Sequence, residues 1–287
     1  MIYYMGKFNK ITIIGVGLIG GSIGLAIKKK RLAKEVIGVF RRTSTLKKAL
    51  KHKAVDKGTM SIEDGVKDAD LIILATPVSL IPSMAREAIK YAKRNTVITD
   101  VGSTKKWIVD KIEGQLARSI RGLFFIGSHP MAGSEHAGVE FARADLLNGS
   151  PCIVTKTAKT GAAALKKITG FWKALGAKVN VMSPAAHDKS VSLISHLPHI
   201  VAFGLAGAVP VKELKYAAEG FKDTTRVALS DPRLWADIFA SNKREIAKAG
   251  LAFEKYYKKI IKAITQGRYS EIVRLLEEAK DVRSFLT

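Results

Sequence analysis

GVGLIG, residues 15–20, places three glycines in the spacing G-x-G-x-x-G. The apolar run KITII (10–14) precedes it, and a run of helical periodicity follows it. In a strand–turn–helix unit, such glycines permit a tight turn, let the backbone approach a pyrophosphate and let the helix pack on its strand. The N-terminal N–H groups of the helix then face the phosphates. The alternative is a glycine-rich turn without a ligand, but the flanking strand and helix favour a dinucleotide site at Gly15, Gly17, Leu18, Ile19 and Gly20.

The same pattern continues along the first two thirds of the chain, where short apolar runs alternate with amphipathic helical runs. Such alternation is typical of crossover units that build a mainly parallel sheet with helices on both faces. After residue 183 only helical patterns remain. We therefore expect a Rossmann-type α/β domain, residues 1–182, and an all-α helical domain, residues 183–287. The strand-like runs are KITIIGVG, EVIGVF, DLIILATP, TVITDVG, LFFIGSHP, PCIVT and KVNVMS.

Composition favours an ordered globular protein, because 47% of the 287 residues are hydrophobic. The single cysteine, Cys152, allows no disulfide within the chain, which fits a reducing cytoplasm. The first ten residues lack the apolar segment of a signal peptide. Two longer uncharged runs, 11–27 and 193–211, are interrupted by glycines or by histidine and proline. We expect a cytoplasmic protein without a membrane span.

The formal charge of +23 admits two interpretations. Clustered cations bind nucleic acid, whereas a solvated lysine-rich surface attracts small anions. The basic runs KKKR (28–31) and KKIIK (258–262) lie on amphipathic helical patterns, and aromatic residues do not interleave with them. We therefore expect a small anionic substrate and no nucleic-acid partner.

The stretch VIGVFRRTS, residues 36–44, bears on the choice of cofactor. In NAD-binding versions of this unit, a carboxylate at the end of the second strand accepts hydrogen bonds from the adenosine ribose. Here Phe40 holds that place and two arginines follow it, so a 2'-phosphate would meet cations instead of a carboxylate. The stretch predicts NADP, bound through Arg41, Arg42 and Thr43. If the arginines are surface cations only, NAD is the alternative.

Three further strand ends carry polar clusters, namely ATPVS (75–79), TDVGSTK (99–105) and GSHPMAGSEHAG (127–138). Ligands of open parallel sheets bind beyond the carboxyl ends of the strands, so we expect Thr76 and Pro77 at the cofactor. His129 follows the strand-like run LFFIG, and an imidazole can take the proton of a hydroxyl whose carbon gives up hydride. Ser103 is expected to hydrogen-bond this imidazole and fix its tautomer. The alternative for His129 is a structural histidine.

Five motifs in order, between residues 10 and 242, resemble the prephenate and arogenate dehydrogenases of tyrosine biosynthesis. The resemblance implies oxidative decarboxylation of prephenate to 4-hydroxyphenylpyruvate, or of arogenate to tyrosine, with hydride transfer to NAD(P). It also implies a dimer through the helical domain, which carries more apolar helical faces than a small lone bundle needs; the alternative is a monomer. The motifs are GVGLIGGSIG, TDVGSTK, GSHPMAGSEHAG, SHLPH and GFKDTTR.

The resemblance assigns roles to single residues. His129 matches the catalytic histidine of the family, and Ser103 matches the serine that orients histidine and substrate. Arg226 matches the arginine that grips a substrate carboxylate, and its forked guanidinium suits that task. His199 matches another substrate-side residue. Two positions near the pocket entrance, which help to gate or order it, are Ser134 and Glu135.

Some features limit the resemblance or leave alternatives open. Glu219 stands where many relatives have glycine, so a carboxylate is added near an acidic substrate. His196 and His199 have a spacing that could suit a metal, but Pro198 lies between them and no cysteine or carboxylate cluster joins them, so we expect no metal. His187 is expected to cap a helix or join the domains. The remaining alternatives are a β-hydroxyacid-type dehydrogenase, which would use a catalytic lysine, and a non-enzymatic NADP-binding sensor.

Overall fold

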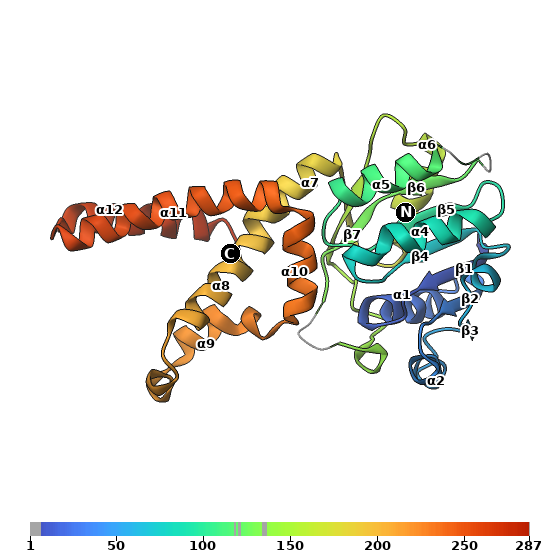
Figure 1. The fold of residues 1–287 in the computed structure, drawn as a ribbon, viewed down its shortest axis with the longest axis horizontal. Coiled ribbons are helices and arrows are strands. Elements are labelled where there is room, and N and C mark those ends of the chain that lie inside the picture. The colour runs from blue at the N-terminus through green and yellow to red at the C-terminus, as the bar shows by residue number, and fades with distance from the viewer. Residues whose placement is uncertain (1–6, 118, 120–121, 134–136, 287) are drawn as a thin grey trace. The chain divides into compact units, whose positions relative to one another are not determined.

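The computed structural model describes residues 7–117, 119, 122–133 and 137–286. By internal packing the chain forms two compact units, Met1–Asn242 and Lys243–Thr287. The first unit holds all described strands and the second holds two helices. The ribbon is shown in Figure 1.

A six-stranded parallel sheet forms the centre of the first unit. Its strands lie in the order β3-β2-β1-β4-β5-β6. Strands β2 and β3 are therefore added on one side of β1 and the later strands on its other side, so the order of the strands reverses between β1 and β4. A reversal of this kind opens a crevice at the carboxyl ends of the two strands, where dinucleotides bind. The expected Rossmann-type architecture is confirmed. The strands are β1 Phe8–Ile14, β2 Ala33–Val39, β3 Lys57–Thr59, β4 Leu71–Leu74, β5 Val97–Asp100 and β6 Phe124–Ile126.

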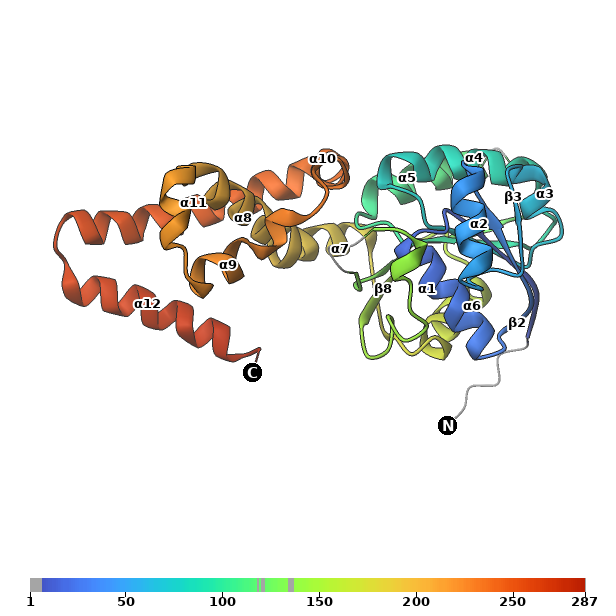
Figure 2. The ribbon, with the colours of Figure 1, turned by 90° about the horizontal axis from the view of Figure 1, so that it is seen from below.

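Helices cover both faces of this sheet (Figure 2). On one face, α1 (Leu18–Lys29) and α6 (Ala162–Ala174) bury their apolar side chains against the strands. On the other face, α4 (Ile81–Tyr91) and α5 (Lys106–Leu116) do the same, beside the short α3 (Ile62–Val66). Because both faces are buried, central strands such as LIIL are apolar throughout. The remaining helix of this part is α2 (Thr43–Lys51).

A second, three-stranded sheet carries the residue of greatest interest, His129. It contains β7 (Ser128–Pro130), β8 (Pro151–Thr155) and β9 (Lys178–Met182), with β7 antiparallel to β8 and β8 parallel to β9. The run LFFIGSHP, expected as one strand, is broken at Gly127 into β6 and β7, which belong to different sheets. The sequence pattern predicts neither this break nor the edge strand β3, which at three residues is too short to show an apolar pattern.

Helices alone follow β9 in the described chain. Pro184–Ala208 comprises α7 (Pro184–Val191), η3 (Ser192–His196) and α8 (Leu197–Ala208), and by length and composition it could cross a membrane. Three of its polar side chains, His187, Asp188 and His196, are nevertheless buried inside the first unit. The later elements of this unit are η4 (Val211–Tyr216), α9 (Glu219–Thr225), η5 (Arg226–Leu229) and α10 (Pro232–Ser241).

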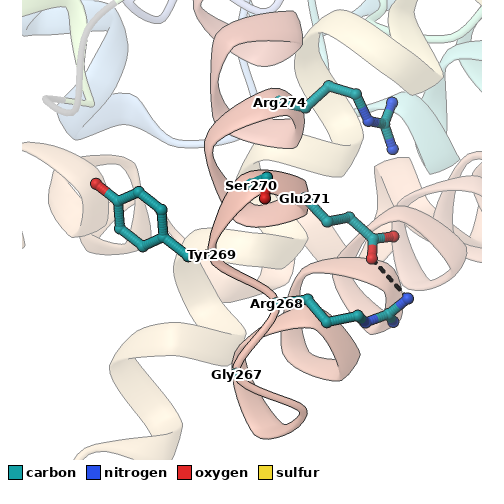
Figure 3. A pocket seen from close by; sticks show the side chains of 6 residues that line it. All are labelled: Gly267, Arg268, Tyr269, Ser270, Glu271 and Arg274. Atoms are coloured by element: carbon teal, nitrogen blue, oxygen red, sulfur yellow. Dashed lines mark ion pairs between the residues drawn. The ribbon is translucent and has the colours of Figure 1, made fainter.

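The second unit is a helical hairpin of α11 (Lys243–Thr265) and α12 (Tyr269–Ser284). Tyr256 Oη donates a hydrogen bond to the Leu275 carbonyl at 2.6 Å and ties the two helices together. An open hollow lies at the turn, where Arg268 pairs with Glu271 at 2.7 Å (Figure 3). Large apolar side chains remain exposed along both helices, among them Leu251, Tyr257, Ile264 and Leu276.

Candidate active site

The glycine turn after β1 has the geometry that a dinucleotide requires. Gly15 has φ +94°, and a Cβ there would lie 2.7 Å from the Ala75 carbonyl oxygen. A Cβ on Gly20 would lie 2.2 Å from the carbonyl oxygen of Gly15. Gly17, the N-cap of α1, has no neighbour within 4 Å of its own Cβ position. The space in front of the helix N-terminus, where Leu18 and Ile19 begin α1, is therefore open to a phosphate group.

The loop after β4 supplies a second observation that fits a cofactor. Thr76 Oγ1 is shielded from solvent and has no hydrogen-bond partner among the described residues. A buried hydroxyl without a partner costs free energy unless a ligand satisfies it. Its methyl group lies 3.0 Å from the Cβ position of Gly15, so the hydroxyl belongs to the glycine turn. Pro77 follows it, exposed, as the N-cap of η1 (Val78–Leu80).

The end of β2 bears on the ribose. The ring of Phe40 is buried and would meet a Cβ on Gly38 at 2.5 Å or on Gly58 at 2.9 Å, so it packs in the core and not in the cofactor crevice. Arg41, Arg42 and Thr43 are exposed. No residue that the structure describes pairs with either guanidinium group.

His129 is the first member of a buried chain of hydrogen bonds. Its Nδ1 lies 2.8 Å from Nε2 of His187, and Nδ1 of His187 lies 2.7 Å from Oδ1 of Asp188. The same carboxylate accepts the backbone N–H groups of Lys105 at 2.7 Å and Lys106 at 3.0 Å, where α5 begins. The chain thus runs from β7 through α7 to the N-terminus of α5.

These partners fix where the protons lie. The Asp188 carboxylate only accepts hydrogen bonds, so His187 donates to it from Nδ1. In a neutral His187, Nε2 is then an acceptor, and His129 donates from its own Nδ1. Nε2 of His129 is therefore unprotonated and can accept a proton. Burial holds the pKa of His129 well below its usual value, and the neighbouring His187 and the Lys105 ammonium group lower it further. Burial likewise lowers the pKa of His187, against the opposing hydrogen bond from Asp188.

A buried ion pair between Lys105 and Asp100 holds the backbone next to His129. Lys105 Nζ bonds the carboxylate of Asp100 and the carbonyl of Ser128, the latter at 2.8 Å. Asp100 in turn accepts the N–H of Ser128 at 3.0 Å, so both backbone groups of the residue before His129 are held. Trp172 Nε1 donates to the Ser128 hydroxyl at 2.9 Å. Burial lowers the pKa of Lys105, and Asp100 opposes that change.

Ser103 lies half-buried in the loop between β5 and α5. Within the described part of the chain, no hydrogen bond joins it to His129. In the structure, His187 and Asp188 hold Nδ1 of His129, and a contact of Ser103 with the imidazole stays a prediction. Only the histidine–aspartate pair in AAHD could have signalled this from the sequence, and the expected joining role of His187 agrees with its bond to β7.

On the substrate side, His199 of α8 stacks on Trp235 with ring centroids 3.5 Å apart. Its Nδ1 contacts the Ser195 carbonyl at 2.9 Å, which leaves Nε2 for a ligand. Burial lowers the pKa of His199, and the charge of Arg226 adds to the effect, so Arg226 lies within electrostatic range. Ser134 and Glu135 lie outside the described residues. Among the residues that are described, no histidine, cysteine or carboxylate cluster has a metal-binding arrangement.

Two family models match the chain. The nucleotide-binding domain of prephenate dehydrogenase matches residues 23–181, and the dimerization domain of prephenate dehydrogenase matches residues 183–278. The prephenate dehydrogenase of Bacillus subtilis is 36% identical, over 97% of this chain and 76% of that protein.

Solved structures agree. That of Aquifex aeolicus prephenate dehydrogenase with hydroxyphenyl propionate and NAD+ is 34% identical, with a TM-score of 0.89 over 97% of this chain and 98% of that one. The arogenate dehydrogenase of Synechocystis is 29% identical, with a TM-score of 0.82 over 97% of this chain and 100% of that one. The chain belongs to the prephenate dehydrogenase family.

Proposed function

We propose that this chain is an NAD(P)-dependent dehydrogenase that oxidatively decarboxylates prephenate or arogenate. The observation that carries the proposal is the chain of hydrogen bonds from His129 through His187 to Asp188, which leaves Nε2 of His129 as a buried base. Family membership supplies the substrate class. The open cradle at Gly17 and the unpartnered Thr76 hydroxyl fit a dinucleotide.

His129 then performs the proton transfer. Its Nε2 accepts the proton of the ring hydroxyl as that carbon is oxidised, and the resulting imidazolium is stabilised through His187 by the Asp188 carboxylate. The bound nicotinamide supplies the hydride acceptor. The new ketone takes up the electrons of the breaking bond to the ring carboxylate, carbon dioxide leaves, and the ring becomes aromatic. His129 returns the proton to the phenolate oxygen, so it ends the cycle neutral.

The remaining residues bind and orient the substrate. Arg226 offers a guanidinium for a carboxylate, and His199 offers an Nε2 that has been set by its Trp235 stack and its bond to Ser195. Ser103 is proposed to contact the ring hydroxyl from the β5 loop. The roles of Ser134 and Glu135 near the entrance rest on the resemblance.

For the cofactor we propose NADP over NAD. Phe40 is turned into the core, so no side chain at that position repels a 2'-phosphate. Arg41 and Arg42 are exposed beside the N-terminus of α2, without partners among the residues described, and Thr43 adds a hydroxyl.

We also propose a homodimer in the cytoplasm, without nucleic-acid or membrane partners. The match to a dimerization domain and the exposed apolar side chains of α11 and α12 support self-association. The division into a nucleotide-binding part, 1–182, and a helical part, 183–287, follows the end of the last described strand, β9.

Initial rates test the function. Formation of reduced cofactor is measured with prephenate and with arogenate, each against NADP and NAD. We expect turnover of at least one substrate with NADP preferred, and a loss of roughly 10²-fold or more in kcat in His129→Asn with cofactor affinity retained. His52→Asn, at an exposed histidine, is the control. Absence of turnover with all four pairs would contradict the proposal.

The arginine pair is tested in the same assay. The double variant Arg41→Ala with Arg42→Ala should lose about tenfold or more in kcat/KM for NADP and change little for NAD, since a charge-assisted contact is removed only from the phosphate. Arg86→Ala with Arg94→Ala, at two other exposed arginines, is the control. Equal effects on both cofactors would show that Arg41 and Arg42 do not bind the 2'-phosphate of NADP.

A further inference from the structure

His196 is a buried histidine that the proposed mechanism does not use. It lies in η3, one π-helical turn between the α-helices α7 and α8. Such wide turns are rare, and they often mark functional sites because they re-aim side chains. His196 is 1% exposed, with its ring edge-on to Trp235 at 6.0 Å, on the side of the helix that also presents His199.

The contacts of Asn242 fix the proton on His196. Asn242 Nδ2 donates to the Asp188 carbonyl at 2.9 Å, which establishes that this atom is the amide nitrogen. The same nitrogen lies 3.3 Å from Nδ1 of His196, so Nδ1 is an acceptor. Burial lowers the pKa of His196 to about 4, and the ring is therefore neutral at pH 7. A neutral ring that accepts at Nδ1 carries its proton on Nε2.

That Nε2–H group makes no hydrogen bond of ordinary length and angle in the part of the chain that the structure describes. The backbone of Ser103 lies near enough to raise the pKa of His196 against the effect of burial, but it leaves the donor without a full partner. Its surroundings belong to the proposed site. The neighbouring His187 and His199 both lower the pKa of His196, and the backbone of Ser103 raises it from the β5 loop. His196 in turn acts on His129. The unpaired donor thus lies between the base at His129 and the carboxylate-binding side at His199 and Arg226.

We propose that Nε2–H of His196 binds the substrate's ring carboxylate, the group that leaves as carbon dioxide. The proposal rests on the proposed function. The substrate has its hydroxyl at one end of the ring and the ring carboxylate, beside the side chain, at the other. With the hydroxyl at His129 and the side-chain carboxylate at Arg226, the ring carboxylate needs a donor of its own.

A neutral donor suits this particular carboxylate. The group loses its charge when it leaves, so a fixed cation would stabilise the bound substrate more than the transition state and slow the reaction. A neutral N–H group orients the carboxylate with a smaller penalty. The buried environment therefore contributes to this role, because it keeps His196 neutral.

Two variants and one inhibitor test this inference. His196→Phe keeps a ring but removes the donor, and His196→Gln returns an N–H near the position of Nε2. Hydroxyphenylpropionate has the hydroxyl and the side-chain carboxylate but no ring carboxylate. We expect His196→Phe to lower kcat/KM for the better substrate by about 10- to 100-fold, to leave the inhibition constant of hydroxyphenylpropionate within about twofold, and to be partly rescued by His196→Gln.

Several outcomes would overturn the inference. A parallel rise in the inhibition constant would place His196 against a part shared by substrate and inhibitor, and a rise in the cofactor KM alone would place it at the dinucleotide. Leu193→Ala, on an exposed side chain of the same π-helical turn, is the matched control and should leave kcat/KM unchanged. If the wild-type chain turns over neither substrate, the proposed function fails instead, so the two failures are distinct.

Discussion

At the scale of single residues, Asp188 decides what His129 can do. Its carboxylate accepts two backbone N–H groups of the start of α5 and the Nδ1–H of His187. That third bond sets the tautomer of His187, which sets the tautomer of His129. The basic nitrogen of the proposed catalytic residue is therefore determined two side chains away.

Asp188→Asn tests this dependence. The amide has one oxygen and one NH2 group where the carboxylate met three donors, so at least one contact becomes repulsive, and the charge that stabilises an imidazolium is lost. We expect kcat to fall by about 10²- to 10⁴-fold, with the cofactor KM within about threefold.

The control is Asp110→Asn, because Asp110 pairs with Lys106 of the same helix and is exposed. Thermal melts of both variants separate a folding defect from a catalytic one. A kcat for Asp188→Asn within about twofold of wild type would show that the tautomer does not depend on this carboxylate.

The sequence predicts His129 but not the residues that hold it. A histidine after a strand end in a family motif is visible in one dimension, whereas His187 is 58 residues away and is joined to it only by tertiary packing. For Phe40, the sequence correctly indicates that a carboxylate is missing, but not that the ring turns into the core against Gly38 and Gly58. Side-chain direction depends on the neighbouring strand, which the local pattern does not contain.

At the scale of elements, the turn between β1 and α1 separates glycines that serve the fold from a glycine that serves the ligand. Gly20 lies against backbone, with 2.2 Å between its Cβ position and the Gly15 carbonyl oxygen. Gly17 faces open space. The spacing G-x-G-x-x-G alone does not distinguish these two requirements.

Gly17→Ala and Gly20→Ala form a matched pair. The first should raise the cofactor KM by about 10- to 100-fold, because the methyl group occupies the approach to the phosphates, with a change in the free energy of unfolding of less than about 1 kcal/mol. The second should lower the free energy of unfolding by roughly 2 kcal/mol or more, since the backbone has to shift. Urea denaturation and cofactor titration measure both. A large stability loss in Gly17→Ala would refute the division.

The broken run LFFIGSHP shows a feature at this scale that the sequence pattern does not predict. Apolar periodicity finds extended segments, but it does not reveal that Gly127 marks a change of sheet. In the structure the Thr155 N–H bonds the Gly127 carbonyl at 2.8 Å, and a Cβ on Gly127 would lie 2.6 Å from Thr155 Oγ1. This break turns β7 out of the parallel sheet and carries His129 toward His187.

At the scale of the whole molecule, a change in secondary structure and a change in packing fall at different places. Strands end with β9, near the boundary expected from the sequence, whereas the compact units divide after Asn242. The reason is that α7 packs with the sheet unit through His187 and Asp188, while α8 and α10 do so through Phe203 and Trp235. Helical periodicity indicates that such helices bury a face, but not which partner covers it.

The buried histidines make the stability of the whole molecule depend on pH. The pKa values of His129, His187 and His196 are all lowered by burial, that of His196 to about 4. Histidines of the unfolded chain have a pKa of about 6.5, so below that pH the unfolded chain binds protons that the folded chain does not bind. This contribution to stability is complete above about pH 6.5 and is lost as the pH falls through the window toward 4. For His196 alone, the change across the window is roughly 3 kcal/mol.

We therefore expect the free energy of unfolding, measured by urea denaturation, to fall steadily between pH 6.5 and 4.5. In His196→Phe the free energy of unfolding should fall less steeply over the same range, because one of the three histidines no longer takes up a proton on unfolding. This slope does not depend on how stable the variant is at pH 7. His52→Phe, at an exposed histidine, should keep the wild-type slope. A wild-type stability that is flat from pH 6.5 to 4.5 would mean that the three histidines are protonated in the folded protein, and the base at His129 would then be lost together with the neutral donor at His196.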